Sequence, residues 1–267
     1  MASQPIYQFY AELLDYEPKI WRRFQVPGNI TLARLGYIVM ALYEMKGNHL
    51  FQFIVPNGFN HAVFDKAHGI QDESLDLEKF TTYLLPDEEM EEMTAEMDAK
   101  DMAATKMKDL FFPVAGEKLL MEYDFGDSWQ VELTLESVTK DPDLPGKELP
   151  RVLDGKGFGI VEDCGGTPGL AEVAQAFKDK NSEAYYEYRQ WLGVKNLNLE
   201  RLDKKDMNVR LKKLPRIFQS LYENGEPMSQ ASIDFLERAY KRKPKKKPGR
   251  QWVWVYTGKD KRDDESE

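Results

Sequence analysis

Apolar and polar residues alternate in two short segments near the start of the chain. In residues 6–14 every second side chain is apolar, which is the period of a β-strand with one buried face. Residues 20–26 predict a second strand, and Pro27 and Gly28 close it as turn residues. The sequence therefore opens with two strands joined by a short turn.

The next apolar residues recur at helical spacing between Leu32 and Met45, with Thr31 or Asn29 as the predicted N-cap. Residues 49–55 then predict a third strand. The first 56 residues thus predict a β-β-α-β unit, in which a helix covers one face of a sheet.

A β-hairpin is predicted further along, where residues 119–125 and 129–135 alternate on either side of a turn. The turn lies within Tyr-Asp-Phe-Gly-Asp-Ser-Trp, residues 123–129. Gly126 is expected to supply a positive φ, and the nearby aspartates to accept hydrogen bonds from backbone N–H groups.

The remaining pattern is mostly helical. Helices are predicted over residues 87–110, 170–179, 183–192 and 199–214, with irregular connections over 57–82 and 141–169. The fold class is α+β: the N-terminal β-β-α-β unit and an antiparallel hairpin sheet, packed with helices. We expect one domain over residues 1–214.

A C-terminal extension is predicted over residues 215–267. It begins with a helical segment and continues into a basic run, a possible strand over 251–257 and a disordered acidic tail over 259–267.

Composition bears on the cellular location and the partners of the protein. The chain has 267 residues, of which 42% are hydrophobic and 31% charged, and it contains one cysteine. It has no apolar run of about 18 residues and no basic segment followed by an apolar leader. These features predict a cytoplasmic protein without a membrane partner, and an unidentified protein is the expected partner.

Charge is unevenly distributed. The net charge is −9, yet residues 238–250 contain eight lysines and arginines and no acid. The rest of the chain is acidic and would repel a phosphate backbone, so any contact with nucleic acid must involve this run and the aromatic residues after it. The candidate nucleic-acid-binding residues are Lys241, Arg242, Lys243, Lys245, Lys246, Lys247, Arg250, Trp252 and Trp254. The alternative is a solvated linker.

Four acids form the candidate metal site, because hard divalent cations prefer oxygen ligands. They are Asp124, Asp127, Glu162 and Asp163. The alternative is that the two hairpin acids only stabilise the turn. No HxH, HExxH or CxxC spacing occurs, so no local zinc motif is present and no resident cofactor is predicted beyond a possible divalent cation.

Further candidates would line a groove between the hairpin and the Glu-Asp-Cys-Gly-Gly segment, residues 162–166. Cys164 could act as a nucleophile with His49 as its base, or be a buried apolar thiol. Trp129 is expected to be a core or groove aromatic. In Trp21-Arg22-Arg23, an arginine could pair with the hairpin acids or face solvent.

Three segments together resemble the plasmid pRiA4b Orf-three-like family, also labelled a transposon passenger family. They are residues 18–53, the hairpin segment 123–136, and residues 149–170, and the resemblance covers residues 5–212. It implies an α+β fold. The family often has histidine where Gly36 and Val131 stand here, so the resemblance implies that a histidine-based activity would be impaired.

Three functions follow from these observations. The first is a binding or adaptor protein, with a possible plasmid or mobile-element context. The second is a metal-assisted hydrolase that uses the four acids. The third is a nucleic-acid accessory protein that acts through the basic run. The missing histidines and the lack of a nucleophile–base pair favour the first.

Overall fold

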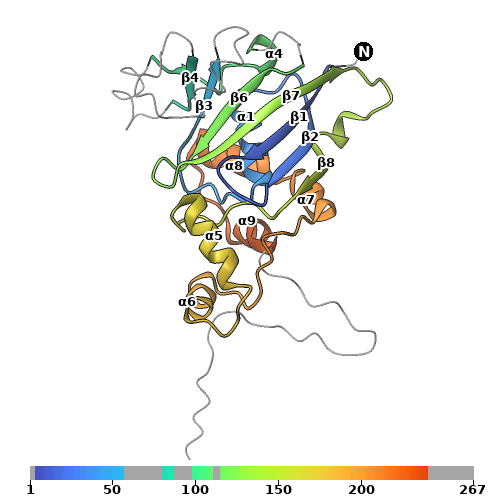
Figure 1. The fold of residues 1–267 in the computed structure, drawn as a ribbon. Coiled ribbons are helices and arrows are strands. Elements are labelled where there is room, and N and C mark those ends of the chain that lie inside the picture. Colours follow the sequence, from blue (N-terminus) through green and yellow to red (C-terminus); the bar gives the residue numbers. More distant parts are fainter. Residues whose placement is uncertain (1–3, 57–79, 87–97, 111–114, 240–267) are drawn as a thin grey trace, which may run out of the picture.

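The structure is a computed structural model that describes residues 4–56, 80–86, 98–110 and 115–239. In this part of the chain a single eight-stranded sheet runs through the molecule (Figure 1). Its strands are β1 (Ile6–Leu13), β2 (Trp21–Pro27), β3 (Phe51–Pro56), β4 (Phe80–Leu84), β5 (Lys100–Asp101), β6 (Lys118–Tyr123), β7 (Trp129–Thr139) and β8 (Arg151–Lys156).

The strand order is β5-β4-β3-β6-β7-β1-β2-β8. Neighbouring strands are antiparallel except β4 and β5, which are parallel, so the sheet is mixed. The α+β class is confirmed, and so are the early strands and the β6–β7 hairpin. The β-β-α-β unit and the hairpin belong to one sheet, because β6 and β7 lie between β3 and β1.

Seven α-helices complete the described part of the chain. They are α1 (Leu32–Leu42), α4 (Met107–Leu110), α5 (Gly166–Ala176), α6 (Glu183–Leu192), α7 (Lys204–Arg210), α8 (Leu214–Asn224) and α9 (Gln230–Leu236). Short 3-10 turns lie at Gly146–Glu148 and Glu237–Ala239. None of the helices in the described ranges is long and apolar enough to cross a membrane.

Helix α1 forms the centre of the core. It begins at Leu32 because the Thr31 hydroxyl accepts the Arg34 backbone N–H, as an N-cap does. All its residues except Arg34 are buried, since α1 lies against the sheet and also packs against α8. Figure 1 shows both helices behind the sheet. Phe218 of α8 belongs to the same core, although the predicted domain boundary lies just before this helix.

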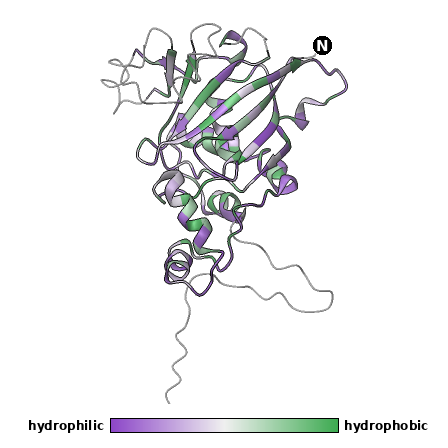
Figure 2. Ribbon diagram, viewed as in Figure 1, coloured by the Kyte–Doolittle hydropathy of each residue, from purple (hydrophilic) through white to green (hydrophobic). Residues whose placement is uncertain are grey.

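The strands alternate between a buried apolar face toward α1 and a more polar face (Figure 2). Arg22 is the exception, because this arginine is fully buried on the helix side. Its guanidinium donates to the carbonyls of Leu42, Lys156 and Phe158 at 2.6–3.0 Å. A buried arginine surrounded by carbonyls ties β2, α1 and the end of β8 together, so Arg22 does not line a groove.

Several predicted boundaries were wrong. The described part of the predicted helix 87–110 contains β5 and the one-turn helix α4 in place of a continuous helix. The predicted connection 141–169 contains β8 and the start of α5. Strand β4 begins inside the segment predicted as irregular.

In the helix predicted over 199–214, only Lys204–Arg210 form α7, and Leu214 begins α8. The basic run from Lys241 onward, the possible strand 251–257 and the acidic tail lie outside the described residues.

Candidate metal centre

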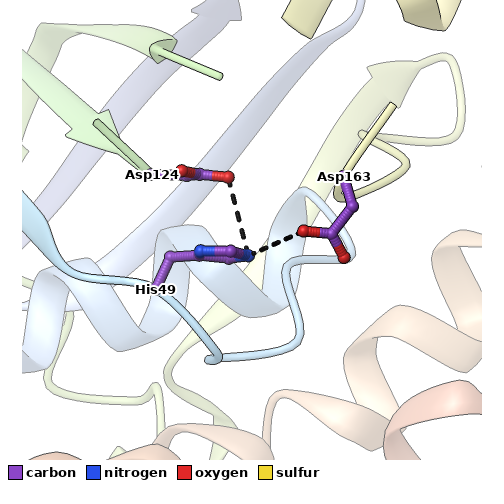
Figure 3. A group of neighbouring side chains, drawn as sticks. All are labelled: His49, Asp124 and Asp163. Atoms are coloured by element: carbon purple, nitrogen blue, oxygen red, sulfur yellow. Dashed lines mark ion pairs between the residues drawn. The ribbon is translucent and has the colours of Figure 1, made fainter. Parts of the chain in front are cut away.

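Three side chains from distant parts of the sequence converge at one end of the sheet (Figure 3). His49 Nε2 lies 3.3 Å from Asp163 Oδ1 and 3.5 Å from Asp124 Oδ2. One ligand atom from each residue can be chosen so that all lie within 4.8 Å of one another. We call His49, Asp124 and Asp163 the acid–histidine cluster.

Strand pairing brings the first two members together. Strand β3 lies beside β6 with Phe51 opposite Tyr123, and the Asp124 N–H donates to the Leu50 carbonyl at 2.9 Å. His49 precedes β3 and Asp124 follows β6, so the antiparallel pairing places both at the same end of the sheet.

Asp124 serves the turn and the cluster with different oxygen atoms. Its Oδ1 accepts the backbone N–H groups of Gly126 and Asp127, as predicted for a turn aspartate, while Oδ2 faces His49. The positive φ values of this turn occur at Asp124 (59°) and Ser128 (50°), so the expectation that Gly126 supplies one was wrong. Such backbone strain in non-glycine residues is often found at functional sites.

The loop before α5 supplies the third member. Asp163 also has a positive φ, of 61°, and its side chain is 61% exposed. The loop is tied to the hairpin turn because Asp127 Oδ2 accepts the Gly165 N–H at 3.2 Å. Gly166 approaches the turn so closely that an added Cβ would lie 2.7 Å from the Asp127 carbonyl oxygen. The hairpin and the Glu-Asp-Cys-Gly-Gly loop, which were predicted to line one groove, therefore contact each other directly.

Glu162, the neighbour of Asp163, points the other way and is only 2% exposed. Its Oε1 accepts the Tyr123 hydroxyl and the Lys46 N–H, both at 2.5 Å, and its Oε2 accepts the Asn48 side-chain amide at 3.3 Å. Both oxygens are thus engaged. Of the four predicted metal ligands, the structure places Asp124 and Asp163 together, turns Glu162 and Asp127 toward other partners, and adds His49.

Tyr123 links this buried carboxylate to the cluster. Its ring meets the His49 ring edge-on, with centroids 5.7 Å apart. Its hydroxyl accepts the Gly47 and Asn48 N–H groups while it donates to Glu162. Burial, followed by the nearby Glu162 carboxylate, raises the pKa of Tyr123, so this hydroxyl keeps its proton as a donor.

The His49 Nε2 atom is screened from solvent and has no hydrogen-bond partner among the described residues, although both carboxylates are in ion-pair range. The His49 carbonyl accepts the Tyr222 hydroxyl from α8, which fixes the backbone at this point. A tetrahedral zinc with ligands at about 2.0–2.1 Å separates its ligand atoms by about 3.3–3.4 Å. The two His49–aspartate separations are close to that spacing.

Cys164 is half-buried, and its thiol donates to the Gly166 carbonyl at 3.6 Å. Burial, followed by the nearby Asp127 charge, raises the pKa of Cys164 to about 12. A thiol with this pKa is protonated at neutral pH, which argues against a nucleophile and favours the alternative of an apolar thiol.

The other predicted residues are not members of the cluster. Trp129 is fully buried in the core. On the sheet face opposite Arg22, Trp21 stacks on Tyr10 with centroids 5.5 Å apart. Arg23 pairs at 2.7 Å with Glu136 of β7, an acid of the second hairpin strand that lies away from the turn acids Asp124 and Asp127. The candidate nucleic-acid-binding residues all lie outside the described ranges.

The two family positions at which histidine is missing are internal. Val131 is fully buried, and a Cβ added to Gly36 would lie 2.3 Å from the Phe51 ring. Neither position is a member of the acid–histidine cluster, so the cluster does not depend on the histidines that this chain lacks.

Sequence reasoning did not assign His49 to the metal set, and it missed Asn48 and Tyr222 altogether. The available signal was the predicted strand over residues 49–55, which begins at His49. If that strand is paired with the first hairpin strand, residue 49 comes beside residue 124.

The chain is similar to a solved structure and matches a protein-family model. A crystal structure of a protein of unknown function, MM3350 from Methanosarcina mazei Go1, is similar to this chain with a TM-score of 0.59 and 25% sequence identity. The similarity covers 76% of this chain and 98% of that one. No curated protein matches.

A family model described as plasmid pRiA4b ORF-3-like protein matches residues 5–209, which contain the described sheet, the acid–histidine cluster, helices α1, α4, α5 and α6, and all of α7 except its last residue. The three segments in which the resemblance was recognised all lie within this range. The chain belongs to the plasmid pRiA4b ORF-3-like family.

Proposed function

We propose that this protein binds a divalent transition-metal cation through His49, Asp124 and Asp163, and that the bound cation supports hydrolysis. The observation that carries the proposal is the approach of the Asp124 and Asp163 carboxylates to His49 Nε2. That nitrogen is screened from solvent, lacks a hydrogen-bond partner among the described residues, and faces two carboxylate oxygens at 3.3 and 3.5 Å.

The ligand types favour particular metals. An imidazole nitrogen with two carboxylate oxygens suits Zn²⁺, Mn²⁺, Fe²⁺ or Co²⁺ better than Ca²⁺ or Mg²⁺, which prefer oxygen alone. Three protein ligands leave coordination positions for water, as in catalytic sites. The exposed Asp163 side chain leaves the cluster reachable from solvent. A metal there would lower the pKa of a bound water toward neutrality and so supply hydroxide for hydrolysis.

Local charge supports a cation in this place. Glu162 is a buried carboxylate next to the cluster in sequence, and no lysine, arginine or histidine of the described residues forms an ion pair with it. Buried charges in proteins are usually paired or coordinate a metal. A divalent cation at the adjacent cluster would offset the charges of Glu162, Asp124 and Asp163 together.

The sequence favours a binding protein and gives a metal-assisted hydrolase as the alternative. The proposal specifies a metal cation as the bound ligand and adds the hydrolysis of that alternative. An adaptor role with a protein partner, a cytoplasmic location, a mobile-element context and nucleic-acid binding through Lys241 to Trp254 stay predictions. The first of them would use the same end of the sheet, where the hairpin meets the Glu-Asp-Cys-Gly-Gly loop.

A metal-free explanation of the same contacts exists and can be separated from the proposal. A protonated His49 imidazole between two aspartates would be an ion-pair network that stabilises the fold. In that case replacing His49 lowers stability, and no cation changes the stability of wild type.

The test is calorimetric titration of chelator-treated protein with Zn²⁺, Mn²⁺ and Mg²⁺, together with thermal unfolding. We expect one Zn²⁺ or Mn²⁺ per chain in wild type and a loss of binding in His49→Gln and Asp163→Asn. Asp143→Asn, an exposed aspartate of the β7–β8 connection, serves as the control and should bind as wild type does. At a free metal concentration 100 times Kd, the stabilisation should be about 2.7 kcal/mol.

Hydrolysis is tested on the same variants with nitrophenyl esters of acetate and phosphate. Activity that requires the added metal and disappears in His49→Gln supports the hydrolase assignment. Stoichiometric binding without any turnover would leave a metal-binding protein and remove the hydrolase part of the proposal.

A further inference from the structure

Each member of the acid–histidine cluster directly follows a residue of a second group, whose side chains are hydrogen-bonded to one another. Asn48 precedes His49, Tyr123 precedes Asp124, and Glu162 precedes Asp163. We call Asn48, Tyr123 and Glu162 the polar triad, in which Tyr123 and Glu162 are buried and Asn48 is exposed. In each pair the second residue belongs to the acid–histidine cluster. The first residue belongs to the triad and is hydrogen-bonded to the other two triad residues.

The triad is closed by three hydrogen bonds. The Tyr123 hydroxyl donates to Glu162 Oε1 at 2.5 Å, and the Asn48 side-chain amide donates to Glu162 Oε2 at 3.3 Å. The Asn48 backbone N–H donates to the Tyr123 hydroxyl oxygen at 3.2 Å. The triad therefore connects the three segments that carry the cluster, with each bond one residue away from a proposed ligand.

We propose that the polar triad positions the metal ligands, with the buried Glu162 and Tyr123 as positioning residues that set the spacing of His49, Asp124 and Asp163. This inference rests on the proposed metal-binding function. Groups behind the ligands orient them, and their loss typically weakens metal affinity by about 10- to 100-fold.

The contacts of each residue fit this role. Asp163 is exposed, and its own backbone has a positive φ. The direction of its side chain therefore depends on the contacts that hold the loop. Glu162 holds it through Tyr123 and through the Lys46 N–H, which belongs to the segment just before His49. The Tyr123 ring also packs edge-on against the His49 imidazole. Loss of the hydroxyl or of the carboxylate would let the three ligands drift apart without removing any of them.

The triad also adds charge without occupying a coordination position. Glu162 is 2% exposed, with both oxygens engaged in the hydrogen bonds above, so it contributes a fixed negative charge behind the ligands. Glu162→Gln removes this charge while keeping nearly the same shape. Tyr123→Phe removes one hydroxyl and keeps the ring against His49. Glu162→Gln therefore tests the charge together with one accepted hydrogen bond, and Tyr123→Phe tests the hydrogen bonds of the hydroxyl with the Glu162 charge kept.

The experiment compares Zn²⁺ and Co²⁺ binding by wild type, Tyr123→Phe and Glu162→Gln, well below the melting temperature of each. Matched controls are Tyr185→Phe, which loses a hydroxyl bonded to the Lys195 carbonyl, and Glu136→Gln, which loses the carboxylate that pairs with Arg23. We expect Kd to rise by about 10- to 100-fold in the two triad variants and to stay within about twofold in the controls. The visible spectrum of bound Co²⁺ should also change in the triad variants, because ligand geometry changes, whereas a purely structural role would leave it as in wild type.

Wild-type affinity and an unchanged Co²⁺ spectrum in both triad variants would overturn the positioning role, even if the variants were less stable, and metal binding itself would stand. No ion bound by wild type would overturn the metal centre and the positioning role together. If one triad variant does not fold, the other variant and Asn48→Ala give the same comparison.

Discussion

Glu162 and Asp163 are consecutive carboxylates with opposite surroundings. Glu162 accepts the Tyr123 hydroxyl at 2.5 Å inside the protein, whereas Asp163 is 61% exposed and lies 3.3 Å from His49 Nε2. One residue therefore anchors the loop and the next presents an oxygen to the cluster. This division of roles explains why two adjacent acids that look equivalent in sequence should respond differently to substitution.

The buried ion pair between Glu44 and Arg210 should dominate the stability of the helical layer. Both side chains are about 3% exposed, and Arg210 donates to both oxygens of Glu44. Arg210→Met leaves the Glu44 carboxylate buried without this partner, so we expect a loss of about 3–5 kcal/mol in unfolding free energy, measured by urea denaturation. The exposed pair of Arg201 with Asp203 provides the control, and Arg201→Met should cost no more than about 1 kcal/mol. Equal losses in the two variants would contradict this account.

The Arg23–Glu136 pair on the polar face of the sheet should give a pH-dependent contribution. The hydrogen bonds from Arg23 lower the pKa of Glu136 in the folded protein. A lowered folded-state pKa means that the stabilisation is present above the unfolded pKa of about 4.3 and is lost as pH falls through the folded value.

A double-mutant cycle with Arg23→Gln and Glu136→Gln should give a coupling of up to about 1 kcal/mol at pH 7, since both side chains are partly exposed. The coupling should decrease as the pH is lowered below 4. A coupling that is constant with pH, or one that grows in acid, would show that the pair does not act through charge.

Cys164 should be unreactive at neutral pH. With its pKa raised to about 12, the thiolate fraction at pH 8 is on the order of 10⁻⁴, against about a quarter for an ordinary thiol. At pH 8, iodoacetamide should alkylate Cys164 in the native protein far more slowly than it alkylates the thiol of glutathione. The variant Cys164→Ala should keep metal binding and any metal-dependent hydrolysis. Alkylation as fast as that of glutathione would restore Cys164 as a candidate nucleophile.

Gly169, in the first turn of α5, should not tolerate a side chain. A Cβ at Gly169 would lie 1.6 Å from the Cys164 carbonyl oxygen, a backbone atom that cannot move without shifting the loop. Gly169→Ala should therefore lower the unfolding free energy by about 1–3 kcal/mol and weaken metal binding, because Asp163 lies on the same loop. Gly146→Ala, with no atom within 4 Å of the added Cβ, should stay within about 0.5 kcal/mol of wild type.

The elements that were predicted well have strong local patterns. Helix α6 occupies the predicted residues, between the Ser182 N-cap and a left-handed Gly193. Strand β7 of the hairpin alternates between buried and partly exposed residues, and β6 departs from this alternation at Leu120, which is buried in a second apolar cluster with Phe80. Strand β8 was missed because it is an edge strand in which only Val152 is buried, so the chain carries almost no periodic signal there.

The candidate site shows the same limit. The sequence predicts that the Asp-Phe-Gly-Asp turn and the Glu-Asp-Cys-Gly-Gly loop line one groove, and the structure brings the two segments into contact through Asp127 and Gly165. It could not assign His49, because the relevant distance depends on which strand pairs with β3. It could not separate Glu162 from Asp163, because the difference lies in the direction of each side chain from the loop.

The central claim, that His49, Asp124 and Asp163 hold a divalent cation, is tested most directly by crystallography with anomalous scattering. Crystals grown with Zn²⁺ should be measured on both sides of the zinc absorption edge, for wild type and for His49→Gln. The account predicts, in wild type, an anomalous peak within about 2.0–2.2 Å of His49 Nε2 and of one oxygen from each aspartate, and no peak there in the variant. A wild-type map without a peak at this position, at a zinc concentration that saturates other surface sites, would contradict the account.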